Sequence, residues 1–183
     1  KGNDLAISFL DLPAFHARVL TLHAGIRIQQ RRHDDALAML AKALALEEQN
    51  RGAEHPSVAF VLGRIGAGHA GLGRWPEAYD ANARAAAIHA GRLRSASAPI
   101  QAEQRVAGDV EAPRDIFLGA ALAALRLSER QPEERRRQLV DKAYQSVQWA
   151  ERSNASTALA QMSARFATGA DALPRLVRER QDL

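Results

Sequence analysis

The chain has no cysteine among its 183 residues. This absence excludes a thiol nucleophile, a disulfide framework and any zinc or iron–sulfur site that needs a cysteine ligand within these residues. No apolar run approaches the roughly 20 residues that a membrane-spanning helix requires, and residues 1–4 lack the apolar core of a signal peptide. We therefore expect a protein that has no membrane partner.

Lysine and aromatic residues are also scarce. Aromatic residues make up 5% of the chain, and only Lys1, Lys42 and Lys142 are lysines, so arginine supplies nearly all the positive charge. A net charge of +4 and a pI near 10.1 would suit a nucleic-acid partner. However, the arginines are interleaved with carboxylates, as at Glu133-Glu134-Arg135-Arg136-Arg137, which is typical of solvated helix faces. We expect no nucleic-acid partner and keep arginine-mediated nucleic-acid binding as the weakest alternative.

Alanine and leucine dominate the rest of the chain, and apolar residues recur at intervals of three and four. That spacing places them on one face of an α-helix. Residues 34–46 carry such a stripe, with Asp34 and Asp35 suited to the positive end of the helix dipole. A second helix begins at Trp75-Pro76, because proline is favoured in a first turn. The sequence thus predicts an all-α protein.

The two helices just described repeat one pattern. Ala36 and Ala78 occupy equivalent places 42 residues apart, and the segments before both also have helical spacing. Each copy is a helical hairpin that cannot bury its apolar face alone, so stacking of neighbouring hairpins must supply the core. We therefore expect two such units in residues 1–91.

The second unit resembles the tetratricopeptide repeat through the segments 62–66, 71–78 and 85–88. The small residues Gly66, Ala78 and Ala85 stand where that repeat needs close helix–helix approach, and Gly73 stands at its inter-helix turn. The resemblance implies an α-α superhelix of stacked antiparallel hairpins. Asn82 replaces the usual aromatic residue and His69 the usual tyrosine, so we expect looser packing in this unit. The 42-residue spacing is similar to the long-linker variant of kinesin light chains and many bacterial proteins.

The same resemblance implies that the first helix of each unit lines a concave surface that holds a protein segment. We expect Phe60 to be the apolar anchor, and Arg18 and Arg64 to favour an acidic or carboxylate-bearing ligand. An alternative stays open, in which Phe60 packs between the units and the groove binds nothing. The residues expected on this surface are Arg18, Thr21, Gly25, Ile28 and Gln29 from the first unit, and Phe60, Gly63, Arg64, Ala67 and Ala70 from the second.

Beyond residue 91 the helical pattern lapses and then resumes. Residues 92–113 contain turn chemistry, so we expect an irregular segment there. We expect residues 114–183 to form further helices that lead to a domain beyond the chain, at 114–127, 133–151, 154–167 and from 171 onward. One face of the second of these helices carries Val140, Ala143, Tyr144, Val147 and Ala150.

Residues 141–150, 158–167 and 176–183 look like the helical region that precedes a CHAT domain in bacterial proteins. CHAT domains are caspase-like modules that follow tetratricopeptide repeats, so the resemblance implies that this chain is a piece of a longer peptidase. In that setting it would either recruit a partner or act as a structural, autoinhibitory arm. The peptidase residues would lie beyond Leu183, so we expect no catalytic residue here. The resemblance favours a bacterial protein. The compartment stays open, because a chain without cysteine suits reducing and oxidising surroundings alike, and we favour the cytoplasm.

Several patterns imitate catalytic or cofactor sites. The run Gly66 to Gly71 has the spacing G-x-G-x-x-G, but a dinucleotide fold needs a strand before it and a second strand after it. We interpret these glycines as helix–helix contacts. The six histidines form no metal-binding spacing, and the adjacent carboxylates Glu47-Glu48 would act as helix-end charges. We therefore expect no cofactor and no metal. Exposed apolar faces at the ends of the repeats could instead pair two copies of the chain.

Overall fold

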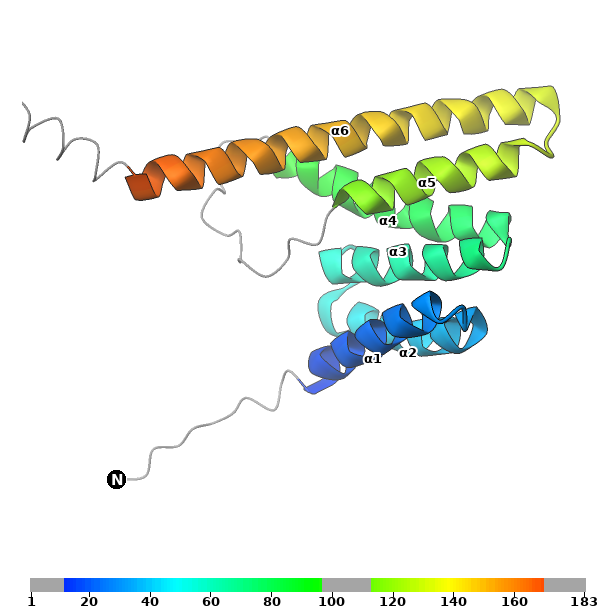
Figure 1. The fold of residues 1–183 in the computed structure, drawn as a ribbon, viewed down its shortest axis with the longest axis horizontal. Helices are drawn as coiled ribbons and strands as arrows, with labels where there is room; N and C mark the ends of the chain where they lie inside the picture. The colour runs from blue at the N-terminus through cyan, green and yellow to red at the C-terminus, as the bar shows by residue number, and fades with distance from the viewer. Residues whose placement is uncertain (1–11, 97–112, 170–183) are drawn as a thin grey trace, which may run out of the picture.

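The computed structural model describes residues 12–96 and 113–169. These residues form six α-helices and no strand. Successive helices fold back on one another as antiparallel hairpins, and three hairpins stack in chain order (Figure 1). The all-α superhelix expected from the sequence is confirmed. The helices are α1 (Leu12–Gln29), α2 (His33–Arg51), α3 (Pro56–Gly71), α4 (Trp75–Ala96), α5 (Pro113–Ser128) and α6 (Glu133–Gly169).

The helices form two layers. The first helices of the hairpins, α1, α3 and α5, contact one another in order, while α2 and α4 each pack between their own first helix and that of the next hairpin. Small residues permit this close stacking, because the fully buried positions Ala17, Ala24, Ala36 and Ala43 leave the backbones near one another. One surface of the stack is therefore built mainly from the odd-numbered helices.

The turns within the first two hairpins are equivalent. Gly73 has a positive φ of 69°, which confirms the inter-helix turn expected there. Arg31, 42 residues earlier, has a φ of 59° at the same place, although this left-handed region favours glycine. The 42-residue repeat therefore extends to the backbone conformation of the turns.

The junction between the first two hairpins is held by side chains. His55 caps α3 by accepting the Ser57 N–H at Nδ1 (3.1 Å), and Pro56 fills the first turn. The Ser57 hydroxyl donates to Glu47 Oε2 at 2.5 Å, and Arg51 approaches the same oxygen at 3.5 Å. Glu47 is buried and tied to α3, so it is more than the helix-end charge expected from the sequence.

The C-terminal part differs from the sequence-based expectation. Residues 92–96 continue α4, and residues 97–112 of the expected irregular segment lie outside the described residues, as do residues 170–183. The helices expected at 133–151 and 154–167 are one helix of 37 residues, α6. Ring stacking of Phe117 on Trp149, with centroids 6.2 Å apart, fixes this helix against α5. On its expected apolar face Ala143 and Ala150 are buried, whereas Val140, Tyr144 and Val147 are exposed.

Candidate peptide-binding groove

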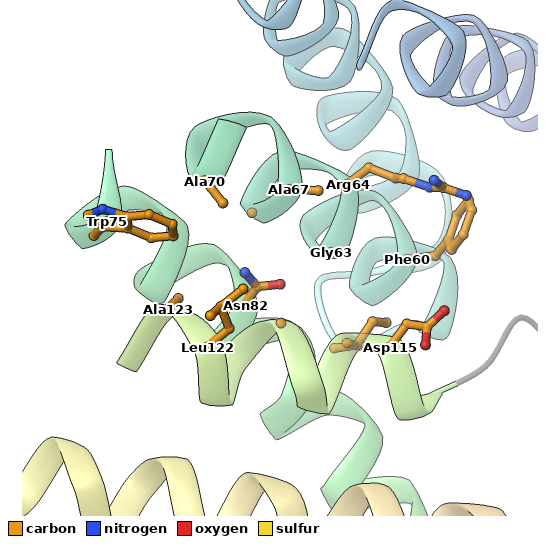
Figure 2. A pocket seen from close by; sticks show the side chains of 13 residues that line it. Phe60, Gly63, Arg64, Ala67, Ala70, Trp75, Asn82, Asp115, Leu122 and Ala123 are labelled. Atoms are coloured by element: carbon orange, nitrogen blue, oxygen red, sulfur yellow. The ribbon is translucent and has the colours of Figure 1, made fainter. Parts of the chain in front are cut away.

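A groove of about 430 Å³ lies between α3, α4 and α5, on the surface built from odd-numbered helices. Figure 2 shows Phe60, Arg64 and Asp115 at one end, Trp75, Ala70 and Ala123 at the other, and Asn82 between them. Apolar and small residues supply most of the wall. It is lined by Phe60, Gly63, Arg64, Gly66, Ala67, Ala70, Trp75, Asn82, Asp115, Ile116, Gly119, Leu122 and Ala123.

Glycines make the groove deep by bringing α5 close to α3. A Cβ on Gly63 would lie 3.0 Å from Cγ1 of Ile116, and a Cβ on Gly66 would lie 2.2 Å from Nδ2 of Asn82. On the opposite helix, a Cβ on Gly119 would lie 2.9 Å from Oδ1 of Asn82. The Asn82 carboxamide therefore fills the space that two missing side chains leave, one on α3 and one on α5.

Asn82 forms the floor of the groove, and only 4% of it is exposed. Its Nδ2 donates to the Ala78 carbonyl at 2.9 Å, and within the described residues Oδ1 accepts no hydrogen bond. The looser packing expected at this position is wrong, because Gly66 and Gly119 close on the carboxamide from both sides. Asn82 lines the groove and its Oδ1 still has free lone pairs, so a ligand N–H in the groove can donate to it.

One end of the groove is charged. The Arg64 guanidinium lies over the Phe60 ring at 5.1 Å from its centroid and reaches across to Gly25 of α1. Asp115, in the first turn of α5, lines the same end. Arg64 makes no ion pair with the residues around it that the structure describes, so its donors are available to a ligand. The sequence-based expectation did not include Asp115.

The other end is apolar and aromatic. Trp75, the first residue of α4, is covered on one side by Arg126 at 5.9 Å from its ring centroid. Leu122 of α5 is exposed and faces the groove, with Ala123 beside it. This end can bury an apolar side chain, because an indole and a leucine present large apolar surfaces.

Only part of the surface expected from the sequence lies here. Phe60, Gly63, Arg64, Ala67 and Ala70 all line the groove. No residue of the first unit does. Arg18 and Gln29 are exposed elsewhere on α1, whereas Gly25 is close to Arg64. Thr21 and Ile28 point into the core: the buried Thr21 hydroxyl donates to the Ala17 carbonyl at 2.7 Å, and Ile28 packs against the first core cluster.

Sequence reasoning missed the wall that α4 and α5 supply. The period of 42 residues does not continue from α3 to α5, because residues 97–112 intervene, and so α5 was not aligned as the first helix of a third hairpin. The sequence indicates Asn82 only as a position of looser packing, and not as part of the groove. The role of Asn82 follows from its contacts with Gly66 and Gly119. No sequence motif links these two glycines to Asn82.

The patterns that imitate other sites are explained by packing. The run Gly66 to Gly71 is the last part of α3 and not a phosphate loop. Gly66 faces Asn82, Gly68 faces Leu37 and Gly71 faces His33, which confirms helix–helix contacts as the role of these glycines. Across residues 12–96 and 113–169, no group of three His, Asp or Glu side chains is placed to hold a metal.

Membrane-spanning character is likewise missing from the helices of residues 12–96 and 113–169, since none has the necessary combination of length and apolarity.

No curated protein matches the chain. Residues 15–90, which contain the first two hairpins, match the family model described as tetratricopeptide repeat. Repeats of this family generally mediate protein–protein interaction. The stacked hairpins of this segment have the helical-hairpin architecture that the match to this family implies.

Proposed function

We propose that this domain binds an extended segment of a partner protein in the groove between α3, α4 and α5. The buried Asn82 carboxamide on the groove floor carries this proposal. An extended peptide presents main-chain N–H and C=O groups that need partners when they are desolvated. Asn82 Oδ1 can accept one such N–H, while the Trp75 and Leu122 end receives an apolar side chain of the same segment.

Charge at the Phe60 end restricts the ligand further. Arg64 can bind a carboxylate through charge-assisted hydrogen bonds, and the Phe60 ring holds its guanidinium in place. Asp115 lines the same end and would repel a second carboxylate. The proposed ligand therefore carries a single acidic residue or a C-terminal carboxylate, flanked by apolar residues, and not an acidic run.

The arrangement of the arginines supports a protein partner over nucleic acid. Arg32, Arg74 and Arg84 are paired with carboxylates of α2, and Arg136 and Arg137 are both paired with Glu133. Paired arginines have less to gain from phosphate contacts, because each would first lose its carboxylate. Binding of duplex DNA, if present, would weaken steeply with salt, which distinguishes it from groove binding.

Selection from a random peptide library displayed on phage tests the proposed function. We expect the 183-residue chain to select peptides that share one carboxylate next to apolar residues. Phe60→Ala and Arg64→Ala should each weaken a selected peptide by about tenfold or more, which is typical of interface hot spots. Arg18→Ala, at an exposed α1 position outside the groove, is the matched control and should leave affinity unchanged. If neither Phe60→Ala nor Arg64→Ala weakens the affinity for a selected peptide, the groove is not the binding site.

The similarity of residues 141–183 to the region before a CHAT domain supports a more specific role. In a bacterial protein of that kind, the groove would recruit a substrate or regulator for a caspase-like peptidase that follows in the chain. The alternative is a structural arm that covers its own peptidase, in which case the occupant of the groove is intramolecular. Sequencing the gene beyond the codon for Leu183 tests both: a downstream segment with one His and one Cys supports them, and a nearby stop codon contradicts them.

A further inference from the structure

Two stripes of exposed apolar side chains lie outside the groove. The stripe on α1 consists of Leu12, Phe15, Leu22 and Ile26, with Phe15 66% exposed. The stripe on α6 consists of Val140, Tyr144 and Val147, with Tyr144 66% exposed. The stripes belong to the first and last helices of the stack (Figure 1). Contiguous apolar surface of this kind is unusual on a monomer and marks a contact site.

The 42-residue period shows which neighbour the α1 stripe lacks. Val19, which lies between Phe15 and Leu22 on this face, and Ile26 correspond to Val61 and Gly68 of α3. Val61 is buried in the core cluster of the first hairpin, and a Cβ on Gly68 would lie 2.9 Å from Leu37 of α2. The equivalent face of α3 thus packs on the preceding hairpin. In α1 none of the described residues covers this face, and a hollow beside Phe15 lies along it.

The α6 stripe is the opposite half of the same kind of interface. Aligning the first residues of α4 and α6 places Val140 at Asn82 and Tyr144 at Ala86. Asn82 meets Gly119 of α5, and Ala86 packs against two of the core clusters to which α5 contributes. The equivalent face of α4 therefore receives the following hairpin. In α6 this face is open within the described residues.

Charge is also complementary between the two faces. Helix α1 contains no acidic residue, and its exposed surface carries Arg18 beside the apolar stripe. On α6, the exposed carboxylates Asp141 and Glu151 lie next to Tyr144 and Val147, while Arg137 is already paired with Glu133. A basic rim opposite carboxylates favours this pairing over α1 against α1.

We propose that the α6 stripe of one copy of this chain packs on the α1 stripe of a second copy, and so continues the superhelix from one molecule to the next. The occupant is a second copy because the two stripes are the two halves of one interface that the chain already forms twice internally. The contact is head-to-tail, so it leaves one free stripe at each end and allows chains of more than two copies. It is separate from the groove and does not depend on peptide binding.

Sedimentation velocity on the 183-residue chain, over about a hundredfold range of concentration, tests this proposal. Two double variants separate the faces: Phe15→Asp with Leu22→Asp on α1, and Tyr144→Asp with Val147→Asp on α6. The replaced side chains are exposed, so the fold is expected to persist, and far-ultraviolet circular dichroism checks this. Wild type should grow beyond a dimer, each variant alone should stay monomeric, and an equimolar mixture should form a one-to-one dimer.

The mixture is decisive because its members each keep one intact and complementary stripe. Dimers of the α6 variant alone would mean that α1 pairs with α1, and dimers of the α1 variant alone would mean that α6 pairs with α6. Either result overturns the head-to-tail contact, as does a wild type that stays monomeric throughout. Phe60→Ala serves as the control, because it changes the groove and should leave the assembly intact.

Discussion

Two helical glycines, Gly66 and Gly91, allow the packing around Asn82 to be measured. Adding a methyl group at Gly66 places it 2.2 Å from Asn82 Nδ2, whereas none of the described residues lies within 4 Å of the same position at Gly91. Gly91→Ala should therefore stabilise α4 by up to about 1 kcal/mol, the difference in helix propensity. Gly66→Ala should lower the free energy of unfolding by about 1–3 kcal/mol, because overpacking outweighs that gain.

Urea unfolding followed by circular dichroism measures both changes. If Gly66→Ala proves as stable as Gly91→Ala, then Asn82 moves aside freely and does not form a fixed groove floor. The double variant Gly66→Ala with Asn82→Ser refines the result, since the shorter side chain should recover part of the loss.

At the scale of elements, the junction of α2 and α3 depends on one carboxylate and not on its neighbour. Glu47 is buried and accepts the Ser57 hydroxyl, while the adjacent Glu48 forms a partly exposed ion pair with Arg84 at 2.6 Å. Glu47→Ala should lower the free energy of unfolding by about 2–3 kcal/mol, because the partly buried Ser57 hydroxyl loses a charged hydrogen-bond partner. Glu48→Ala should cost at most about 1 kcal/mol.

Thermal and urea unfolding of the two variants provides the comparison, with Glu48→Ala as the matched control. Equal, small losses would show that the Glu47 contact contributes no more than a surface ion pair. An equal, large loss would instead indicate that both carboxylates hold the two hairpins together.

Helices whose bounds are set by nearby residues could be predicted from the sequence, whereas features that depend on contacts between distant helices could not. The stripe starting at Ala36 and the start of α4 at Trp75 follow from spacing and turn chemistry, so both were predicted. The continuity of α6 was not, because Asn154 has a helix-starting preference and yet lies within the helix. Phe60 and Arg64 were placed by the repeat, whereas Asp115 depends on where α5 docks, and nothing local to residue 115 specifies that.

At the scale of the whole molecule, two histidines make stability depend on pH. Burial lowers the pKa of His69, with Glu77 and Asp34 opposing and Arg74 reinforcing the shift, and burial with nearby Arg92 lowers the pKa of His89. Both have a buried ring nitrogen without a hydrogen-bond partner in the described part of the chain. Below the ordinary value of 6.5, the unfolded chain therefore binds more protons than the folded chain.

The free energy of unfolding should consequently be constant near neutral pH and fall as pH drops through 6.5 toward the lowered values. Thermal unfolding between about pH 7.5 and pH 5.5 measures the loss. The variant His89→Gln cannot bind this proton and should lose less stability over the same interval. Parallel curves for the variant and the wild type would show that His89 does not contribute.

The contact of Asn82 with Gly66 and Gly119 also limits how this protein can change over generations. If Gly66→Ala occurs first, the new methyl group clashes with Asn82. If Asn82 is first replaced by a smaller residue, the replacement leaves a void in the groove floor. Neither order begins with a harmless single step. Descendants of this chain are therefore expected to keep the asparagine and both glycines together or to replace them together, so the three positions should be inherited as one unit.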